Sequence, residues 1–395
     1  MRFLSLNHLR LGRAPAGIPT DVASDRLAFS SRAVWQRAVA LAMREHVHAV
    51  LLTGETISHA NSGLEPWGPL IDGIVDLERA GIPIITTEHG EFTAENLERF
   101  TPTDAVHWLN ETLNWNPVFT TTTDPLDNGA VHIVAGALAE SLDSPVKNPI
   151  TLDQIDRPDS IWILTDSVHP DLVAGEYALV VEPGSASALT ARETGRHGAW
   201  LIDTELRHAE LFPLAGLEYA AIDIDISDAE TLEHLEQIIG STLVDLVDAA
   251  RSDGSVAETM VVDATLVGAS KLYPALSTTA EELQTMLRIE HSNMTIALSR
   301  TSIDATPQID LEPLLIRPDP VGEVARLIQA LDTGDALSEA QARLLNATEQ
   351  KLLAISHARV FGSILDMETD MDAFTLLRRQ GWATLDALVR QRGID

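Results

Sequence analysis

The sequence predicts an α/β protein that continues into a small α+β domain and a helical C-terminal region. Three observations carry this prediction. Residues 1–205 alternate short apolar runs with stretches of helical periodicity, as βαβ units around a buried sheet do. Near residue 206 this alternation gives way to a longer strand pattern of period two. Residues 321–395 carry almost only helical patterns, so we expect domains at 1–205, 206–300 and 301–395.

The first domain opens with strand, helix, strand, helix and strand in quick succession. The first strand covers Phe3–Leu6, and a helix follows at Phe29–Glu45, where a pair of serines supplies an N-cap. Strands at His48–Thr53 and Ile82–Thr87 flank a helix at Trp67–Ala80. Four further strands are expected, at Val131–Ala135, Ile161–Thr165, Tyr177–Val181 and Ala199–Asp203.

The second domain begins with the alternating strand Tyr219–Ile226. Ser227 and Glu230 match a capping box for a helix that runs to about Ala250. A second strand at Glu258–Val267 and a short helix at Thr279–Leu287 complete this domain.

The C-terminal region follows the proline-rich segment 311–320. Helices are predicted at Pro320–Leu331 and Ala340–Ala354, the second with a capping pattern from Ser338 and Gln341. Both helices place apolar residues at i, i+3, i+4 and i+7. Such stripes pack on the chain's own body or form a surface for a partner helix, and the sequence leaves both interpretations open.

The charge of the chain is unusual, because 59 acidic residues stand against 27 Lys and Arg, giving a formal charge of −32. A protein this acidic repels DNA unless a basic patch or a basic partner offsets its field, although the acidity also fits a simple role in solubility. The chain has no cysteine, and its N-terminus lacks a signal peptide. With no apolar run of membrane-spanning length, we expect a soluble cytoplasmic protein without a membrane partner.

Four loops with polar side chains follow predicted strands, and the carboxyl ends of such strands often share one edge of a sheet. They read NHLRLG (7–12), GETIS (54–58), TEHGE (87–91) and DSVHP (166–170). Three or four His and Glu ligands suffice for a zinc-type hydrolase. The candidates are His8, Glu55, His59, His89, Glu91 and His169. The alternative interpretation is that each histidine forms hydrogen bonds only within its own loop.

Taken with their spacing, the loops resemble those of the SbcD-type exonucleases of the calcineurin-like metallophosphoesterases, which read D-x-H-L-G, G-D-x-x-D, G-N-H-[DE] and G-H-x-H. Residues 182–203 resemble a further stretch of that family, with Gly184, Ser185, Glu193, Gly195 and Gly198 at matching positions. The resemblance implies a calcineurin-like metallophosphoesterase sandwich with a small α+β capping domain and a helical C-terminal region. It also implies a manganese-dependent DNA exonuclease that is commonly dimeric and works with an SMC-like (SbcC-type) ATPase.

The chain departs from that family at the metal ligands. His8 stands at the first aspartate and Arg10 at the first histidine, while Glu55 and Ser58 replace two further aspartates. Ser58 falls at the ligand that bridges two metal ions, where a serine brings no formal charge. Arg10 adds a positive charge that does not deprotonate. In the last loop Ser167 replaces a histidine, whereas His169 is retained. A second interpretation of Arg10 is an anion-binding group that pairs with Glu55 or holds a phosphate.

These departures favour a pseudo-enzyme with no cofactor. We expect it to be a subunit or scaffold of an SMC-like ATPase in DNA repair or genome defence, and to contact DNA only through that complex. The alternative is an active Mn²⁺-dependent exonuclease or phosphoesterase with atypical ligands. Its metal ligands would be His8, Glu55, His59 and Glu91, with His89 or His169 as the general acid. A third possibility is an acidic decoy or assembly module without nucleotide chemistry.

Overall fold

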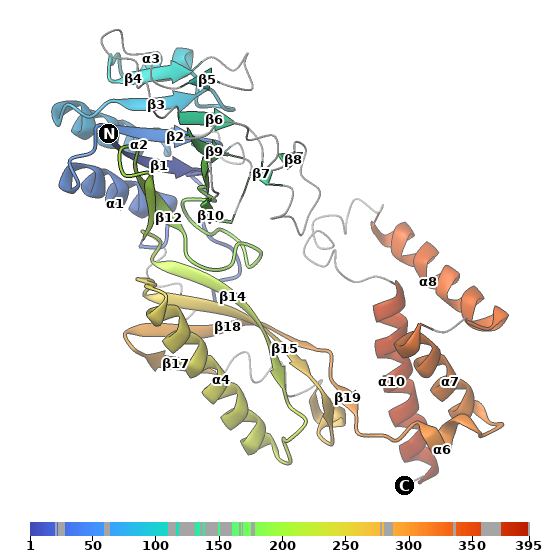
Figure 1. Ribbon diagram of the computed structural model, residues 1–395. Helices are drawn as coiled ribbons and strands as arrows, with labels where there is room; N and C mark the ends of the chain where they lie inside the picture. Colours follow the sequence, from blue (N-terminus) through green and yellow to red (C-terminus); the bar gives the residue numbers. More distant parts are fainter. Residues whose placement is uncertain are drawn as a thin grey trace. The chain divides into compact units, whose positions relative to one another are not determined.

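The structure is a computed structural model of the 395-residue chain (Figure 1). It describes residues 1–19, 22, 28–58, 64–109, 116–117, 131–134, 137–138, 149–150, 160–165, 167, 169–174, 178–276, 279, 287–334, 337–356 and 373–393. The protein is mixed α/β and divides into two compact units. Unit 1 comprises Met1–Ile222, Leu243–Asp263 and Leu287–Arg300, and unit 2 comprises Asp223–Thr242, Ala264–Met286 and Thr301–Asp395. The three-domain division that the sequence suggested stays a prediction.

Unit 1 contains a six-stranded sheet of order β13-β12-β1-β2-β3-β4. Four of its strands are parallel: β1 (Arg2–Asn7), β2 (Ala49–Thr53), β3 (Ile84–Thr87) and β4 (Val106–Leu109). Helices α1 (Ser31–Arg44), α2 (Trp67–Arg79) and α3 (Ala94–Phe100) connect them. Ser30 caps α1, as its serine pair predicted. On the other side of β1, β12 (Gly198–Asp203) and β13 (His208–Pro213) add antiparallel strands.

A second sheet of order β10-β11-β9-β6-β5 also belongs to unit 1. Its strands are β5 (Asn116–Pro117), β6 (Val131–Val134), β9 (Ser160–Leu164), β10 (Asp171–Ala174) and β11 (Ala178–Glu182), and a small separate pair joins β7 (Ala137–Leu138) to β8 (Pro149–Ile150).

The residues of β1 show how the layers of unit 1 are arranged. Leu4 belongs to the same buried cluster as Trp35 and Leu70 of helices α1 and α2. Its neighbour Phe3 belongs to a different cluster, which includes Ile161 of the second sheet. Successive side chains of a strand point to opposite faces, so helices cover one face of the six-stranded sheet and the second sheet covers the other.

A four-stranded sheet has the order β14-β15-β18-β17, formed by β14 (Leu217–Asp225), β15 (Thr259–Val267), β18 (Met294–Ile303) and β17 (Arg288–His291). Helix α4 covers Leu232–Ser252. The predicted capping box for this helix is wrong, because the Thr231 hydroxyl accepts the His234 N–H at 3.1 Å instead. The Ser227 hydroxyl is engaged elsewhere, donating to Asp225 at 2.7 Å and accepting the Ala269 N–H at 3.2 Å. The helix predicted at 279–287 lies outside the described residues except at its two ends.

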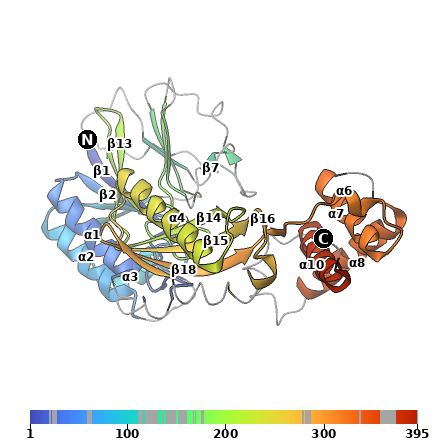
Figure 2. The same ribbon diagram turned by 90° about the horizontal axis from the view of Figure 1, so that it is seen from below.

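Unit 2 contains the strand pair β16 (Ala269–Ser270) and β19 (Thr306–Pro307) and the helices α6 (Glu312–Leu315), α7 (Pro320–Thr333), α8 (Glu339–Ser356) and α10 (Ala373–Arg392) (Figure 2). The capping box predicted for α8 is confirmed. Ser338 N–H donates to Gln341 Oε1 at 2.9 Å, and Gln341 N–H donates to Ser338 Oγ at 3.4 Å.

The apolar face of α7 is buried inside unit 2. Val321, Ala325 and Ile328 of α7 form one cluster with Trp382 and Leu385 of α10. The structure therefore shows that the apolar stripe of α7 packs on the chain's own body. Among the helices that the structure describes, none combines the length and the apolar character needed to cross a membrane.

Candidate functional site at the ends of strands β1 and β2

The loops that follow β1 and β2 run side by side. The strands are in parallel register, with Asn7 opposite Thr53. Beyond them His8 N–H donates to the Thr53 carbonyl at 3.0 Å, and Arg10 N–H donates to the Glu55 carbonyl at 2.8 Å. The two predicted ligand loops are thus held together by backbone hydrogen bonds, as their places at adjacent strand ends predicted.

The backbone of the first loop is unusual, since His8 and Arg10 have φ values of 46° and 49°. Residues other than glycine rarely adopt this left-handed region, and such conformations gather at functional sites. Gly54 lies opposite with a φ of 66°, and a Cβ atom there would lie 2.6 Å from Nδ1 of His8. Only glycine therefore lets the second loop approach the His8 ring so closely.

His8 is a largely buried imidazole with its ring nitrogens engaged. The Glu55 N–H donates to Nδ1 at 3.1 Å, so in the neutral ring the proton is on Nε2. The pKa of His8 is lowered to about 4, chiefly by burial and also by the charges of Arg10 and His89, while Glu55 and a hydrogen bond with the Thr165 backbone oppose this shift. His8 is therefore neutral near pH 7, and its Nδ1 lone pair accepts a hydrogen bond.

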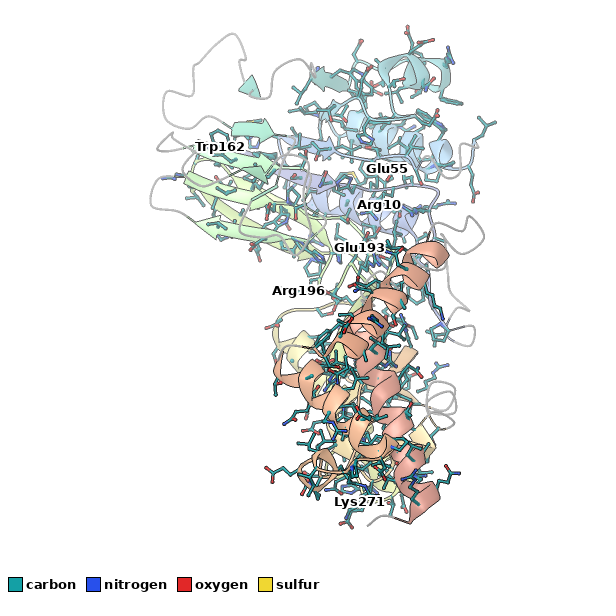
Figure 3. All side chains as sticks on the ribbon, turned by 90° about the vertical axis from the view of Figure 1, so that its right-hand side faces the viewer. Arg10, Glu55, Trp162, Glu193, Arg196 and Lys271 are labelled. Atoms are coloured by element: carbon teal, nitrogen blue, oxygen red, sulfur yellow. The ribbon has the colours of Figure 1, made fainter. Side chains whose placement is uncertain are left out.

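Arg10 forms a buried ion pair with Glu193. Its Nη1 atom lies 2.6 Å from Oε1 of Glu193, and the two side chains are only 7% and 10% exposed. The Nη2 atom donates to the hydroxyl of Ser185, which is completely buried. The other carboxylate oxygen of Glu193 accepts the Leu189 N–H at 2.8 Å. In Figure 3 the labelled Arg10 lies beside Glu193, with Glu55 on its other side.

The segment that supplies Ser185 and Glu193 is itself held by buried contacts. Ala186 N–H donates to the Asn7 carbonyl at 2.7 Å, which joins this segment to the end of β1. His197 lies 2.8 Å from the Ser185 carbonyl through Nδ1 and 3.2 Å from the Glu193 carbonyl through Nε2. Burial lowers the pKa of His197, and the two carbonyls hold its ring between Ser185 and Glu193.

The remaining predicted site residues lie more openly. His89 is exposed in the turn after β3, although its charge reaches His8. Glu91 is partly buried, and its backbone carbonyl accepts the Asn96 side-chain N–H at 2.9 Å. His169 is exposed, and its charge acts on His197. His59 lies outside the described residues.

The structure thus brings His8, Arg10, Glu55 and His89 within electrostatic range of one another. Among the residues it describes, no group of three or more His, Asp and Glu side chains is placed to hold a metal ion. Sequence reasoning missed His197, and it noted Ser185 and Glu193 only as positions of the family framework. No spacing rule finds the Arg10 contact with Glu193, because 183 residues separate the two in the chain.

Comparison with known proteins does not supply a family. No protein-family model matches the chain, and no curated protein matches it. Among solved structures, TT1561 of Thermus thermophilus is 14% identical, and the match covers 54% of this chain and 98% of that chain with a TM-score of 0.28. A likeness of that size carries no argument about fold or activity, so the functional case depends on the residues themselves.

Proposed function

We propose that the chain is an SbcD-like protein of the calcineurin-like metallophosphoesterase class whose metal centre is degenerate. In this proposal it serves as a non-catalytic subunit or scaffold of an SMC-like, SbcC-type ATPase, as a homodimer that meets DNA only through the complex. The observation that carries the proposal is the buried ion pair of Arg10 with Glu193, where the resembled family places its first metal loop.

The residues of this site do not fit a pair of divalent metal ions. The Arg10 guanidinium keeps its charge at any physiological pH, and a buried cation repels a metal ion beside it. His8 accepts the Glu55 N–H through Nδ1, so this nitrogen has no lone pair left for a ligand bond. Ser58 is buried and offers a hydroxyl in place of a bridging carboxylate.

The same contacts give the loop a structural role instead. Arg10 joins the first loop to the segment with Ser185 and Glu193. The Arg10 guanidinium and the Glu193 carboxylate are both buried and neutralise each other. A metal pair would bind these loops together through shared ligands. Here a guanidinium, a carboxylate and a hydroxyl connect them, and this replacement supports a retained scaffold.

Metal binding and DNA cleavage by the purified full chain test the first half of the proposal. We expect no calorimetric signal with Mn²⁺ up to about the millimolar range and no shortening of linear duplex DNA. Two bound Mn²⁺ ions per chain, together with cleavage that Glu55→Gln abolishes, would instead establish the active exonuclease with atypical ligands. Glu95→Gln, at an exposed position in α3, is the matched control for the loss of one carboxylate.

The helices of unit 2 support the partner half of the proposal. Helix α8 exposes Leu344 and Leu353 by 45% and 51%, which leaves apolar surface on this helix for a partner. We expect the full chain to bind the SbcC-type ATPase of its own organism, and Leu344→Asp or Leu353→Asp to weaken that binding. Asn346→Asp and Gln350→Asp add the same charge at exposed polar positions of α8 and should leave it unchanged. Equal binding by all four variants would remove α8 from the interface.

A further inference from the structure

Unit 2 contains a cavity of about 600 Å³ beside helix α10, far along the chain from the β1 and β2 loops. One wall is formed by α10 residues that include Arg379, Trp382 and Ala383. The opposite wall comes from Tyr273, which follows β16, and from the segment Ile303–Thr306 that leads from β18 into β19. A volume of this size lies in the range of pockets that hold small organic ligands.

The ring of Trp382 forms part of the wall of this cavity. Trp382 is 7% exposed, and its indole Nε1 has no hydrogen-bond partner. The ring packs on one side into the cluster with Ile328 of α7 and on the other side lines the cavity. The indole N–H itself is shielded from solvent, so a ligand in the cavity would meet the ring of Trp382 and not its N–H.

The charged groups at the cavity nearly balance, but one arginine stands apart from the ion pairs. The cavity lining has three arginines against two aspartates, and two of the arginines are paired. Arg378 lies 2.5 Å from Asp332 and 3.7 Å from Asp304, and Arg390 lies 3.1 Å from Asp386. For Arg379 no ion pair is found with any residue that the structure describes, and its charge acts on Tyr273 across the cavity.

We propose that this cavity binds a small organic anion with an apolar body. Its carboxylate or phosphate head would pair with Arg379, whose fork of N–H groups suits both. The body of the ligand would lie against apolar residues of the lining, among them Leu376, Ala383 and Ala387. The site is separate from the residues used for the function proposed above, because none of its lining residues belongs to unit 1 or to helix α8.

Head-group variants of one apolar body test this proposal on the full chain. The probes are 4-phenylbutyrate, the matching 3-phenylpropyl phosphate, the neutral 4-phenylbutyramide and the cationic 4-phenylbutylamine, titrated by calorimetry. We expect one or both anions to bind at least about tenfold more tightly than the amide and the amine, since charge-assisted contacts separate these heads. Which anion binds better distinguishes a carboxylate ligand from a phosphate ligand.

Variants of Arg379 and a resonance of Trp382 on the cavity wall complete the test. Arg379→Gln should weaken anion binding by about tenfold or more, while Arg379→Lys should retain part of it. In protein labelled with ¹⁵N at tryptophan, the indole resonance that Trp382→Phe removes should shift when the anion is added. Arg343→Gln, at an exposed position of α8, is the matched control and should change neither result.

Three results would overturn the proposal. The first is equal binding of all four probes, which would make the cavity merely apolar. The second is no binding of either anion up to about 10 mM, an affinity too weak for a built site. The third is unchanged anion binding in Arg379→Gln, provided that thermal unfolding shows the variant to be folded.

Discussion

The Nη1 atom of Arg10 lies 2.6 Å from Oε1 of Glu193, across 183 residues of sequence and almost out of contact with water. Burying two charges costs free energy, and their attraction offsets that cost only when further hydrogen bonds satisfy both groups. Ser185 and the Leu189 N–H supply those bonds. The pair therefore fixes the position of the first loop, and removing one partner leaves the other buried and uncompensated.

Glu193→Gln should accordingly destabilise the protein strongly. Breaking a buried pair by removing one charge costs about 3–5 kcal/mol, and urea unfolding at pH 7 would measure it. Glu95→Gln removes an exposed carboxylate that pairs with Arg99 in α3 and should cost less than about 1 kcal/mol. The double variant Arg10→Met/Glu193→Leu should recover much of the loss. If Glu193→Gln and Glu95→Gln lowered the free energy of unfolding equally, the buried ion pair would be no more important for stability than an exposed one.

His8 should make the stability of the protein depend on pH. Its pKa is lowered from 6.5 to about 4, chiefly by burial. Between these values the unfolded chain binds a proton that the folded chain does not, so the free energy of unfolding falls as the pH is lowered through this window. A shift of this size corresponds to about 3 kcal/mol, fully present above pH 6.5 and lost by about pH 4.

Urea unfolding at pH values from 7 to about 4 would measure this dependence. His8→Asn retains an acceptor for the Glu55 N–H and suits the left-handed backbone, yet it cannot titrate. In His8→Asn the free energy of unfolding should therefore depend less on pH in this range. His208→Asn, at an exposed position of β13, should keep the pH dependence of the wild-type protein. Identical slopes in the wild-type protein and His8→Asn would contradict the prediction.

Part of this architecture could be predicted from sequence because the signals are local. The apolar runs of β1, β2 and β3 and the capping pair Ser338 and Gln341 all act over a few residues, and the structure contains them. The edge where the first two loops meet follows from parallel strand order. Local patterns are also where prediction failed, since Ser227 and Thr231 both match a helix cap and only tertiary contacts with Ala269 decide between them.

The contacts that define the site could not be predicted from local signals. That Arg10 pairs with Glu193 depends on β12 returning beside β1 in antiparallel register, an arrangement that no periodicity encodes. His197 carries no signal either, because a lone histidine before a strand has many possible environments. Burial, rather than residue type, gives His8 and His197 their lowered pKa values.

Gly54→Ala should lower the free energy of unfolding by more than the strain of a left-handed backbone alone would. Gly54 has a φ of 66°, and an added Cβ would lie 2.5 Å from Oδ1 of Asn7 as well as against the His8 ring. Gly81 is the matched control, because its φ is 71° and no heavy atom lies within 4 Å of an added Cβ. We expect about 1–2 kcal/mol for Gly81→Ala and above about 3 kcal/mol for Gly54→Ala, by urea unfolding. Equal losses of unfolding free energy in Gly54→Ala and Gly81→Ala would show that the two loops move apart without strain.

Asp319 should stabilise α7 in two separable ways. Its Oδ1 accepts the Gly322 N–H at 3.2 Å as the N-cap, and its Oδ2 accepts a hydrogen bond from Arg317 at 2.8 Å and another from Arg392 of α10. The hydrogen bond from Arg317 is the main reason that the pKa of Asp319 is lowered to about 2. The charged form therefore adds stability that is present above the ordinary carboxyl pKa of 3.8 and is lost as the pH falls toward 2.

Two substitutions separate the cap from the charge. Asp319→Asn retains the cap and loses the ion pairs, whereas Asp319→Ala loses both, so thermal stability should fall in the order Asp, Asn, Ala. Salt screens exposed ion pairs but not a neutral cap, so the gap between Asp and Asn should shrink from low to high ionic strength while the gap between Asn and Ala persists. If Asn were no more stable than Ala at any ionic strength, Asp319 would act on α7 through its charge alone.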